Sequence, residues 1–66
     1  MEEIVLNELK SQENFLINTR ERNEKLRKPL SENQTFQYER AKFIGMLDLA
    51  KKLDIDVSEF NWIYNT

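Results

Sequence analysis

The chain has 66 residues, of which 39% are hydrophobic, so it can form one small domain over residues 1–66. Cysteine and histidine are both absent, which excludes disulfides, thiolate and imidazole metal ligands, and nucleophilic catalysis of the Ser-His or Cys-His kind. The formal charge of -2, with 33% charged residues, excludes a global basic field that would hold nucleic acid. We therefore expect a protein that is not an enzyme and that needs no metal or cofactor.

Composition also predicts the fold class and the location. A single glycine and a single proline favour long helices with short connections, so we expect an all-α protein. The first residues, Met-Glu-Glu, lack the basic start and long apolar run of a signal peptide, and no window approaches the roughly 20 apolar residues of a membrane span. We expect a cytoplasmic protein without a membrane partner. A domain this short has a thin stability margin, which oligomerisation can raise.

The first predicted helix covers about residues 2–27, a stretch that holds neither glycine nor proline. One apolar stripe of the coiled-coil kind runs along it through Val5, Leu9, Leu16, Leu26 and Leu30. Polar residues occupy the stripe positions in between, namely Gln12, Thr19 and Asn23. Two interpretations of them stay open: they sit at a half-exposed boundary, or they are buried and pair across a subunit interface, where they fix the register.

Charge is distributed unevenly along this helix, with acidic residues early and basic residues late. That order complements the helix dipole and is explained by stability alone. A functional interpretation is that the basic segment contacts an anionic partner, although Glu21 and Glu24 interrupt it and no aromatic residue is interleaved. The candidate anion contacts are Arg20, Arg22, Lys25, Arg27 and Lys28.

A second predicted helix covers about residues 31–53. Pro29 closes the first helix, because the residue before proline leaves the helical region and the ring cannot continue the hydrogen-bond ladder. Ser31 as N-cap with Gln34 three residues later matches a capping box. The connection is short, so the two helices should form an antiparallel hairpin. The core-facing stripe of the second helix is Phe36, Phe43, Leu47, Ala50 and Leu53, flanked by Ile44 and Met46.

A second line of residues runs along the far side of this helix through Tyr38, Ala41, Gly45 and Leu49. Gly45 costs about 1 kcal/mol relative to alanine inside a helix, so its place one turn after Ala41 predicts that another backbone approaches closely there. That backbone belongs either to the first helix or to a second subunit. A lone hairpin would leave one of the two apolar faces of this helix exposed to water.

A short third helix is predicted over about residues 57–64. Asp56 is its expected N-cap, with Glu59 at the third helical position and a hydrophobic staple between Ile55 and Phe60. The apolar side chains of this helix should fold back over the open end of the hairpin. They are Val57, Phe60, Trp62, Ile63 and Tyr64.

The end of the second helix and the third helix together resemble a helix-turn-helix motif, and this resemblance implies DNA binding by the third helix. The residues that carry it are Leu49-Ala50-x-x-Leu53-x-Ile55, followed by Phe60 and Ile63. The sequence departs from the motif in two ways. Asp54 stands where the turn glycine is expected, and the third helix has no Arg or Lys to contact bases or phosphates.

The leading functional prediction is a small non-enzymatic protein-protein interaction module, a regulator or inhibitor that binds a protein partner. We expect a homodimer in which two hairpins build a four-helix bundle. Because Trp and Tyr are favoured interface anchors, the C-terminal aromatics join the far side of the second helix as candidates. The predicted partner-binding residues are Tyr38, Ala41, Gly45, Leu49, Trp62 and Tyr64. The alternative is a nucleic-acid-binding protein that uses the helix-turn-helix-like C-terminal half or the basic segment Arg20 to Lys28.

Overall fold

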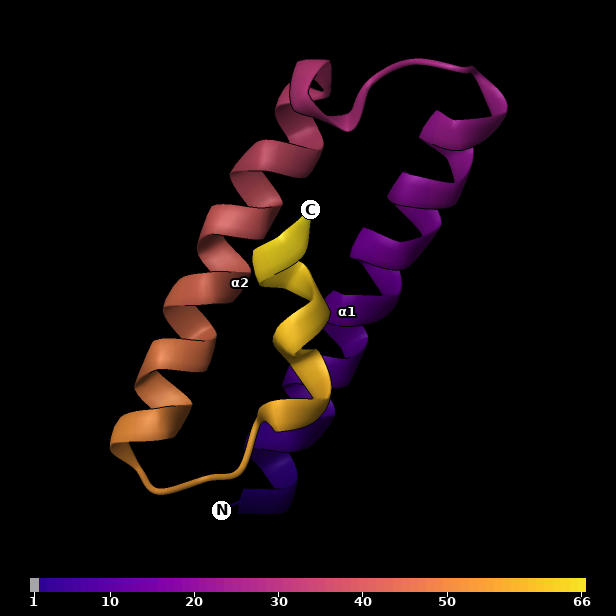
Figure 1. Cartoon of the computed structure of the whole chain (residues 1–66). Helices are drawn as coiled ribbons and strands as arrows, with labels where there is room; N and C mark the ends of the chain where they lie inside the picture. Colours follow the sequence, from indigo (N-terminus) through magenta and orange to yellow (C-terminus); the bar gives the residue numbers. More distant parts are fainter. Residues whose placement is uncertain (1) are drawn as a thin grey trace.

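The computed structural model describes residues 2–66, and Met1 lies outside the described residues. Within that range the chain forms the α-helix α1 (Glu2–Lys25), a single 3₁₀ turn η1 (Leu30–Glu32), the α-helix α2 (Gln34–Lys52) and a C-terminal 3₁₀ helix η2 (Ser58–Asn65), with no strand. α1 and α2 run antiparallel, and η2 lies against one face of their hairpin (Figure 1). The molecule measures 38 × 16 × 16 Å, a length set by the 24 residues of α1. The predicted all-helical hairpin with a short third helix is confirmed.

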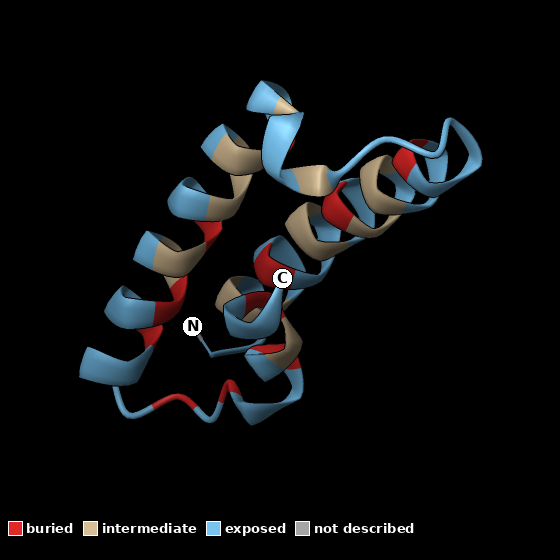
Figure 2. Cartoon of the chain, turned by 45° about the horizontal axis from the view of Figure 1, so that its top comes forward, coloured by how far each residue is buried: buried red, intermediate tan, exposed pale blue. Residues whose placement is uncertain are grey.

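The core lies where the three helices meet (Figure 2). Its fully buried side chains include Leu9 and Leu16 of α1, Phe36, Phe43 and Leu47 of α2, and Phe60 and Ile63 of η2. The predicted stripes fail only at their C-terminal ends, where Leu26 is 60% exposed and Leu53 is 52% exposed. Leu26 follows Leu16 by ten residues, which turns it roughly 80° away from the stripe. Leu53 is the C-cap of α2 and lies beyond its last helical residue.

The polar residues of the first stripe differ in burial. Asn23 is only 6% exposed, while Gln12 and Thr19 are half-buried. The buried Asn23 amide donates to the carbonyl of Lys28 and accepts from Asn33 Nδ2 at 3.2 Å. Asn23 therefore has partners within its own chain, and these partners tie the end of α1 to the turn and to the start of α2.

α1 ends at Lys25, two residues earlier than predicted, and Pro29 does not end it. The amide of Lys28 donates to the carbonyl of Asn23 at 3.3 Å, and the amide of Arg27 donates to the carbonyl of Glu24 at 3.0 Å. These two bonds form a Schellman motif with Arg27 in the left-handed position at a φ of 55°. The end of α2 repeats the motif, with Asp54 at a φ of 60° and the amide of Ile55 donating to Ala50. Both helices thus end on a non-glycine residue in a glycine-type conformation.

The N-cap of α2 is Asn33, and the predicted capping box at Ser31 and Gln34 is wrong. The Asn33 Oδ1 atom accepts from the amide of Phe36 at 2.9 Å. Residues 30–32 instead form η1, in which the amide of Glu32 donates to the carbonyl of Pro29 at 3.1 Å. Because Ser31 lies inside this turn, α2 begins later and a different side chain caps it.

The third helix is a 3₁₀ helix, and its geometry follows from its apolar spacing. Val57, Phe60 and Ile63 are three residues apart, so three residues per turn bring all of them to one buried side. The ring of Phe60 meets that of Phe43 edge-on, with centroids 5.6 Å apart and an interplanar angle of 83°. Val57 stands at the N-cap position, so the predicted N-cap Asp56 is also wrong. The Asp56 carboxylate accepts from the amide of Ser58 at 3.0 Å and stabilises the turn that precedes η2.

Candidate interaction surface

η2 covers one face of the hairpin, and we call this side the covered face. Its central contact to α1 is Trp62, whose Nε1 donates to Glu13 Oε2 at 2.8 Å. The Arg20 guanidinium lies over the same indole, 4.7 Å from the ring centroid. Trp62 is half-buried and its one polar atom has a partner. The side chain therefore serves first to hold η2 on α1.

Two further polar contacts tie η2 to α2. Arg40 Nε donates to the carbonyl of Ile63 at 3.0 Å and to Thr66 Oγ1 at 2.9 Å, so it caps the end of η2. Lys51 Nζ donates to the hydroxyl of Tyr64 at 3.0 Å and lies 4.9 Å from the centroid of its ring. This hydrogen bond raises the pKa of Lys51 above its ordinary value of 10.5.

The opposite side of the hairpin, which we call the open face, carries exposed apolar side chains. Ile4 and Phe15 of α1 and Leu26, the residue that follows α1, are eleven residues apart, about three turns, so they lie in one line. This line is roughly half a helical turn away from Glu13 and Arg20, which contact η2. On α2, Tyr38, Leu49 and Leu53 are likewise roughly half a turn away from Arg40. These six side chains are 44% to 70% exposed.

An apolar groove runs along the open face at the end where α1 begins and α2 ends. It has a volume of about 210 Å³, and its walls are almost free of polar atoms. The residues that line it are Ile4, Val5, Glu8, Leu9, Met46, Leu49, Ala50 and Leu53. Toward the turn, a more polar hollow of about 300 Å³ lies between Phe15 and Leu26 and is bordered by Thr19, Asn33 and Thr35.

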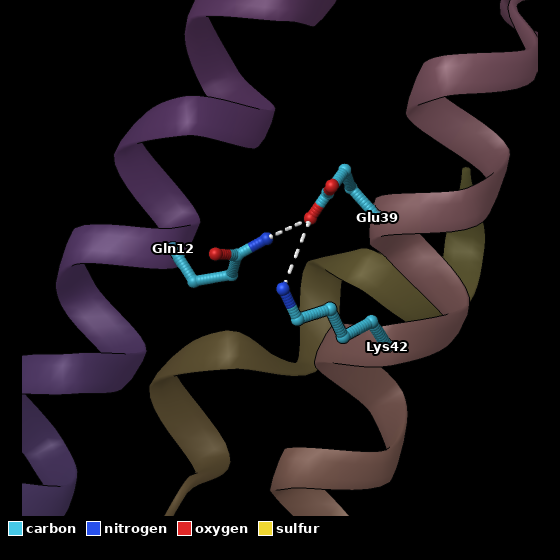
Figure 3. Close-up of polar contacts among 3 residues, drawn as sticks. All are labelled: Gln12, Glu39 and Lys42. Carbon is cyan, nitrogen blue, oxygen red and sulfur yellow. Dashed lines mark hydrogen bonds and ion pairs between the residues drawn. The ribbon is translucent and has the colours of Figure 1, made fainter.

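A polar bridge joins α1 to α2 across the middle of the hairpin (Figure 3). Gln12 Nε2 donates to Glu39 Oε2 at 2.6 Å, and Lys42 Nζ lies 3.9 Å from the same oxygen. In Figure 3 η2 lies behind Lys42, and Gln12 is within about 60° of Phe15 around α1, so the bridge borders the open face. The contact between Lys42 and Glu39 lies within α2 and is the only ion pair among residues 2–66; because Lys42 is exposed, it adds little stability. The hydrogen bond from Gln12 to Glu39 is the contact that joins α1 to α2.

The six predicted partner-binding residues do not form one surface. Tyr38, Ala41, Gly45 and Leu49 are all exposed on α2, whereas Trp62 and Tyr64 belong to η2 on the covered face. A Cβ atom added at Gly45 would meet nothing within 4 Å. The close approach predicted at Gly45 is therefore not made by any part of residues 2–66.

The predicted anion-contact residues are divided in a similar way. Arg20 is half-buried against Trp62, while Arg22, Lys25, Arg27 and Lys28 are exposed around the end of α1. The exposed Glu21 and Glu24 stand among them. Sequence analysis missed the open-face members Ile4 and Phe15, although their eleven-residue spacing and their position off the stripe of Leu9 and Leu16 carried the signal.

Neither helix of the hairpin is long and apolar enough over residues 2–66 to cross a membrane. In the same range no three acidic side chains gather in a way that could hold a metal ion. The fold and surface thus define a helical hairpin with one covered and one open apolar face. No protein-family model matches the chain, and no curated protein or solved structure is significantly similar to it.

Proposed function

We propose that this protein is a small non-enzymatic interaction module that dimerises through the open face into a four-helix bundle and regulates or inhibits a protein partner. A cytoplasmic location is part of the proposal. The observation that carries it is the distribution of exposed apolar side chains. Of the seven large apolar side chains that are most exposed among residues 2–66, six lie on the open face and only Tyr64 lies elsewhere.

Exposed apolar side chains gathered on one face support association, because monomeric proteins rarely leave large apolar patches in water. The groove beside Leu49 gives the surface a concave element that a side chain of another subunit can fill. Tyr38, Ala41, Gly45 and Leu49 stay in the proposed contact region. Trp62 and Tyr64 have a smaller part in it, because both also hold η2 on the hairpin.

Sedimentation of the full chain at micromolar concentration tests the proposal. We expect a dimer for the wild type and a folded monomer for Leu49→Glu, which places a charge beside the apolar groove. Lys52→Glu is the matched control, because Lys52 is exposed on α2 but does not line the groove, and it should remain dimeric. A wild-type chain that is folded and strictly monomeric would overturn the proposed dimer.

Nucleic-acid binding is the weaker alternative. Arg20 is engaged with Trp62, and η2 carries no basic side chain. A titration with duplex DNA at about 50 mM salt is the appropriate test, since electrostatic binding is strong under those conditions. Saturable binding that Arg22→Ala and Lys28→Ala weaken would favour this alternative over the interaction module.

A further inference from the structure

The exposed side of α1 carries a symmetric order of side chains. Ile4, Glu8, Phe15, Arg22 and Leu26 are spaced by four, seven, seven and four residues, which keeps them in one narrow stripe of an α-helix. All five are exposed. A charged residue stands seven positions from Phe15 in each direction, and an aliphatic residue stands eleven positions away. The two charges have opposite signs. When two copies of the stripe run antiparallel, each acidic residue therefore faces a basic one.

We propose that a second copy of this chain packs its α1 antiparallel on this stripe, about a two-fold axis that passes between the two Phe15 side chains. The register pairs Ile4 with Leu26 of the second copy and Glu8 with Arg22 of the second copy. Symmetry then repeats both pairs, as in any isologous interface. The inference rests on the proposed dimer and adds its register and its contact residues.

Charge selects this arrangement over a parallel one. A parallel pairing in register would place Glu8 against Glu8 and Arg22 against Arg22, and such like-charge contacts oppose association. The antiparallel pairing places unlike charges together at both ends. Neither Glu8 nor Arg22 is in an ion pair within residues 2–66, so both are available to the second copy.

Leu26 is 60% exposed in its own chain, and the apolar groove of a second copy offers it a contact. In the proposed register, Leu26 of the second copy arrives at Ile4, where the groove begins. Glu8 lines the same groove and lies one turn after Ile4. Arg22 lies one turn before Leu26, so the two charged residues meet when Ile4 and Leu26 meet. The apolar and the charged contacts therefore require the same register.

This register leaves Ala41 and Gly45 outside the central contact. Both lie on the side of α2 that points away from α1, where a Cβ at Gly45 would meet open space. The inferred interface is thus distinct from one in which two α2 helices approach each other at Gly45. The two arrangements give different results in cross-linking.

Single-cysteine variants test the register, because the chain has no cysteine of its own. Phe15→Cys should give a disulfide-linked dimer on brief oxidation, since a residue beside the two-fold axis faces its own copy within disulfide reach. Ile4→Cys and Leu26→Cys should cross-link with each other when mixed, and less when each is oxidised alone. Asn14→Cys is the matched control, because this exposed neighbour is turned roughly 100° around the helix and should not cross-link.

Charge reversal tests the pairing of Glu8 with Arg22. Glu8→Arg and Arg22→Glu should each raise the dimer dissociation constant about tenfold, measured by sedimentation. The double variant should return to within about threefold of the wild type, because the opposite charges meet again with their positions exchanged. Far-UV circular dichroism checks that every variant keeps its helices.

The outcomes separate this inference from the proposed function. A dimer that Phe15→Cys fails to cross-link, and that Gly45→Cys does cross-link, overturns the register but leaves the proposed dimer standing. Single charge reversals that leave the dissociation constant unchanged also overturn it. A wild-type chain that stays monomeric overturns both the register and the proposed dimer.

Discussion

Large apolar side chains occur on both faces of this hairpin, yet the chain itself covers only one of them. On the covered face, Phe60 and Ile63 are fully buried, and Phe60 packs against Phe43. On the open face, Ile4 is 68% exposed and Phe15 is 44% exposed. The difference follows from the placement of η2, whose eight residues lie along one side of the hairpin.

The polar contacts of the two faces differ as well. Around η2 they join separate elements: Trp62 to Glu13, Arg40 to the end of η2, and Lys51 to Tyr64. On the open face, the hydrogen bond from Gln12 to Glu39 joins the two helices but covers neither of them. The covered face is therefore fixed by contacts between elements of the chain, while the open face is the one that we propose as the dimer contact.

The largest expected effect comes from removing the central side chain of the covered face. Phe60→Ala should lower the free energy of unfolding by about 3–5 kcal/mol, because it leaves a cavity beside Phe43. A small domain has little more stability than that, so the variant should be largely unfolded in a urea titration followed by far-UV circular dichroism.

Phe15→Ala is the control on the open face. At concentrations where the chain is monomeric, its cost should stay below about 1 kcal/mol. Equal losses for Phe60→Ala and Phe15→Ala would contradict the distinction between the faces.

Removing a polar contact at the edge of the covered face should have an intermediate effect on the free energy of unfolding. Glu13→Ala removes the acceptor of the Trp62 Nε1 hydrogen bond and should cost about 1 kcal/mol. Because Trp62 is the only tryptophan, its acrylamide quenching reports on η2 and should increase. Asn33→Ala removes the N-cap of α2 at a similar cost of about 1 kcal/mol but should leave the quenching unchanged. Increased quenching in both variants would show that general destabilisation, and not the contact to η2, exposes Trp62.

A polar substitution on the open face should have a small effect on the monomer. Leu53→Gln should change the free energy of unfolding by less than about 0.5 kcal/mol, since the side chain is already 52% exposed. Leu47→Ala, at a fully buried position of the same helix, should cost about 2–5 kcal/mol. Thermal unfolding at low concentration measures both. A large loss for Leu53→Gln would mean that the chain covers this face itself.

The smallest effects should appear in the pH dependence of stability, because both groups concerned are exposed. Hydrogen bonds from the backbone and side chain of Ser58 hold the pKa of Asp56 below its ordinary 3.8. The stability from Asp56 is thus fully present above about pH 4 and is lost as the pH falls through the lowered pKa. For Lys51, whose pKa is raised above 10.5, the contribution is present below pH 10.5 and is lost as the pH rises through the raised pKa.

Denaturant titrations at several pH values measure these slopes. Asp56→Asn should remove part of the acid-side slope, and Tyr64→Phe should remove part of the alkaline-side slope. Slopes that both variants leave unchanged would contradict the assignment of the two groups.

Helix boundaries show where sequence reasoning reached its limit. Proline and serine signals placed the start of the second helix at residue 31, but Asn33 offers the same kind of cap two residues later. The choice between them depends on the turn after Pro29, which Asn23 holds from the end of α1. Such a contact joins residues ten apart and is not visible in a local pattern.

The candidate site shows a similar limit. Tyr38 and Leu49 were identified from a second line of residues on the far side of one helix, and both are exposed. Trp62 and Tyr64 were grouped with them from residue type alone, and η2 places these two on the other face. Ile4 and Phe15 were missed because a stripe of better matches, Leu9 and Leu16, explained the first helix already.

By itself, the sequence determined the all-helical class, the antiparallel hairpin and the buried stripes, because apolar periodicity and a content of only one glycine act locally along each helix. Only the tertiary structure decided which face η2 covers. That choice depends on contacts between distant residues, such as Trp62 with Glu13 and Phe60 with Phe43. Once η2 is in place, the line of Ile4, Phe15 and Leu26 is left without a cover from its own chain.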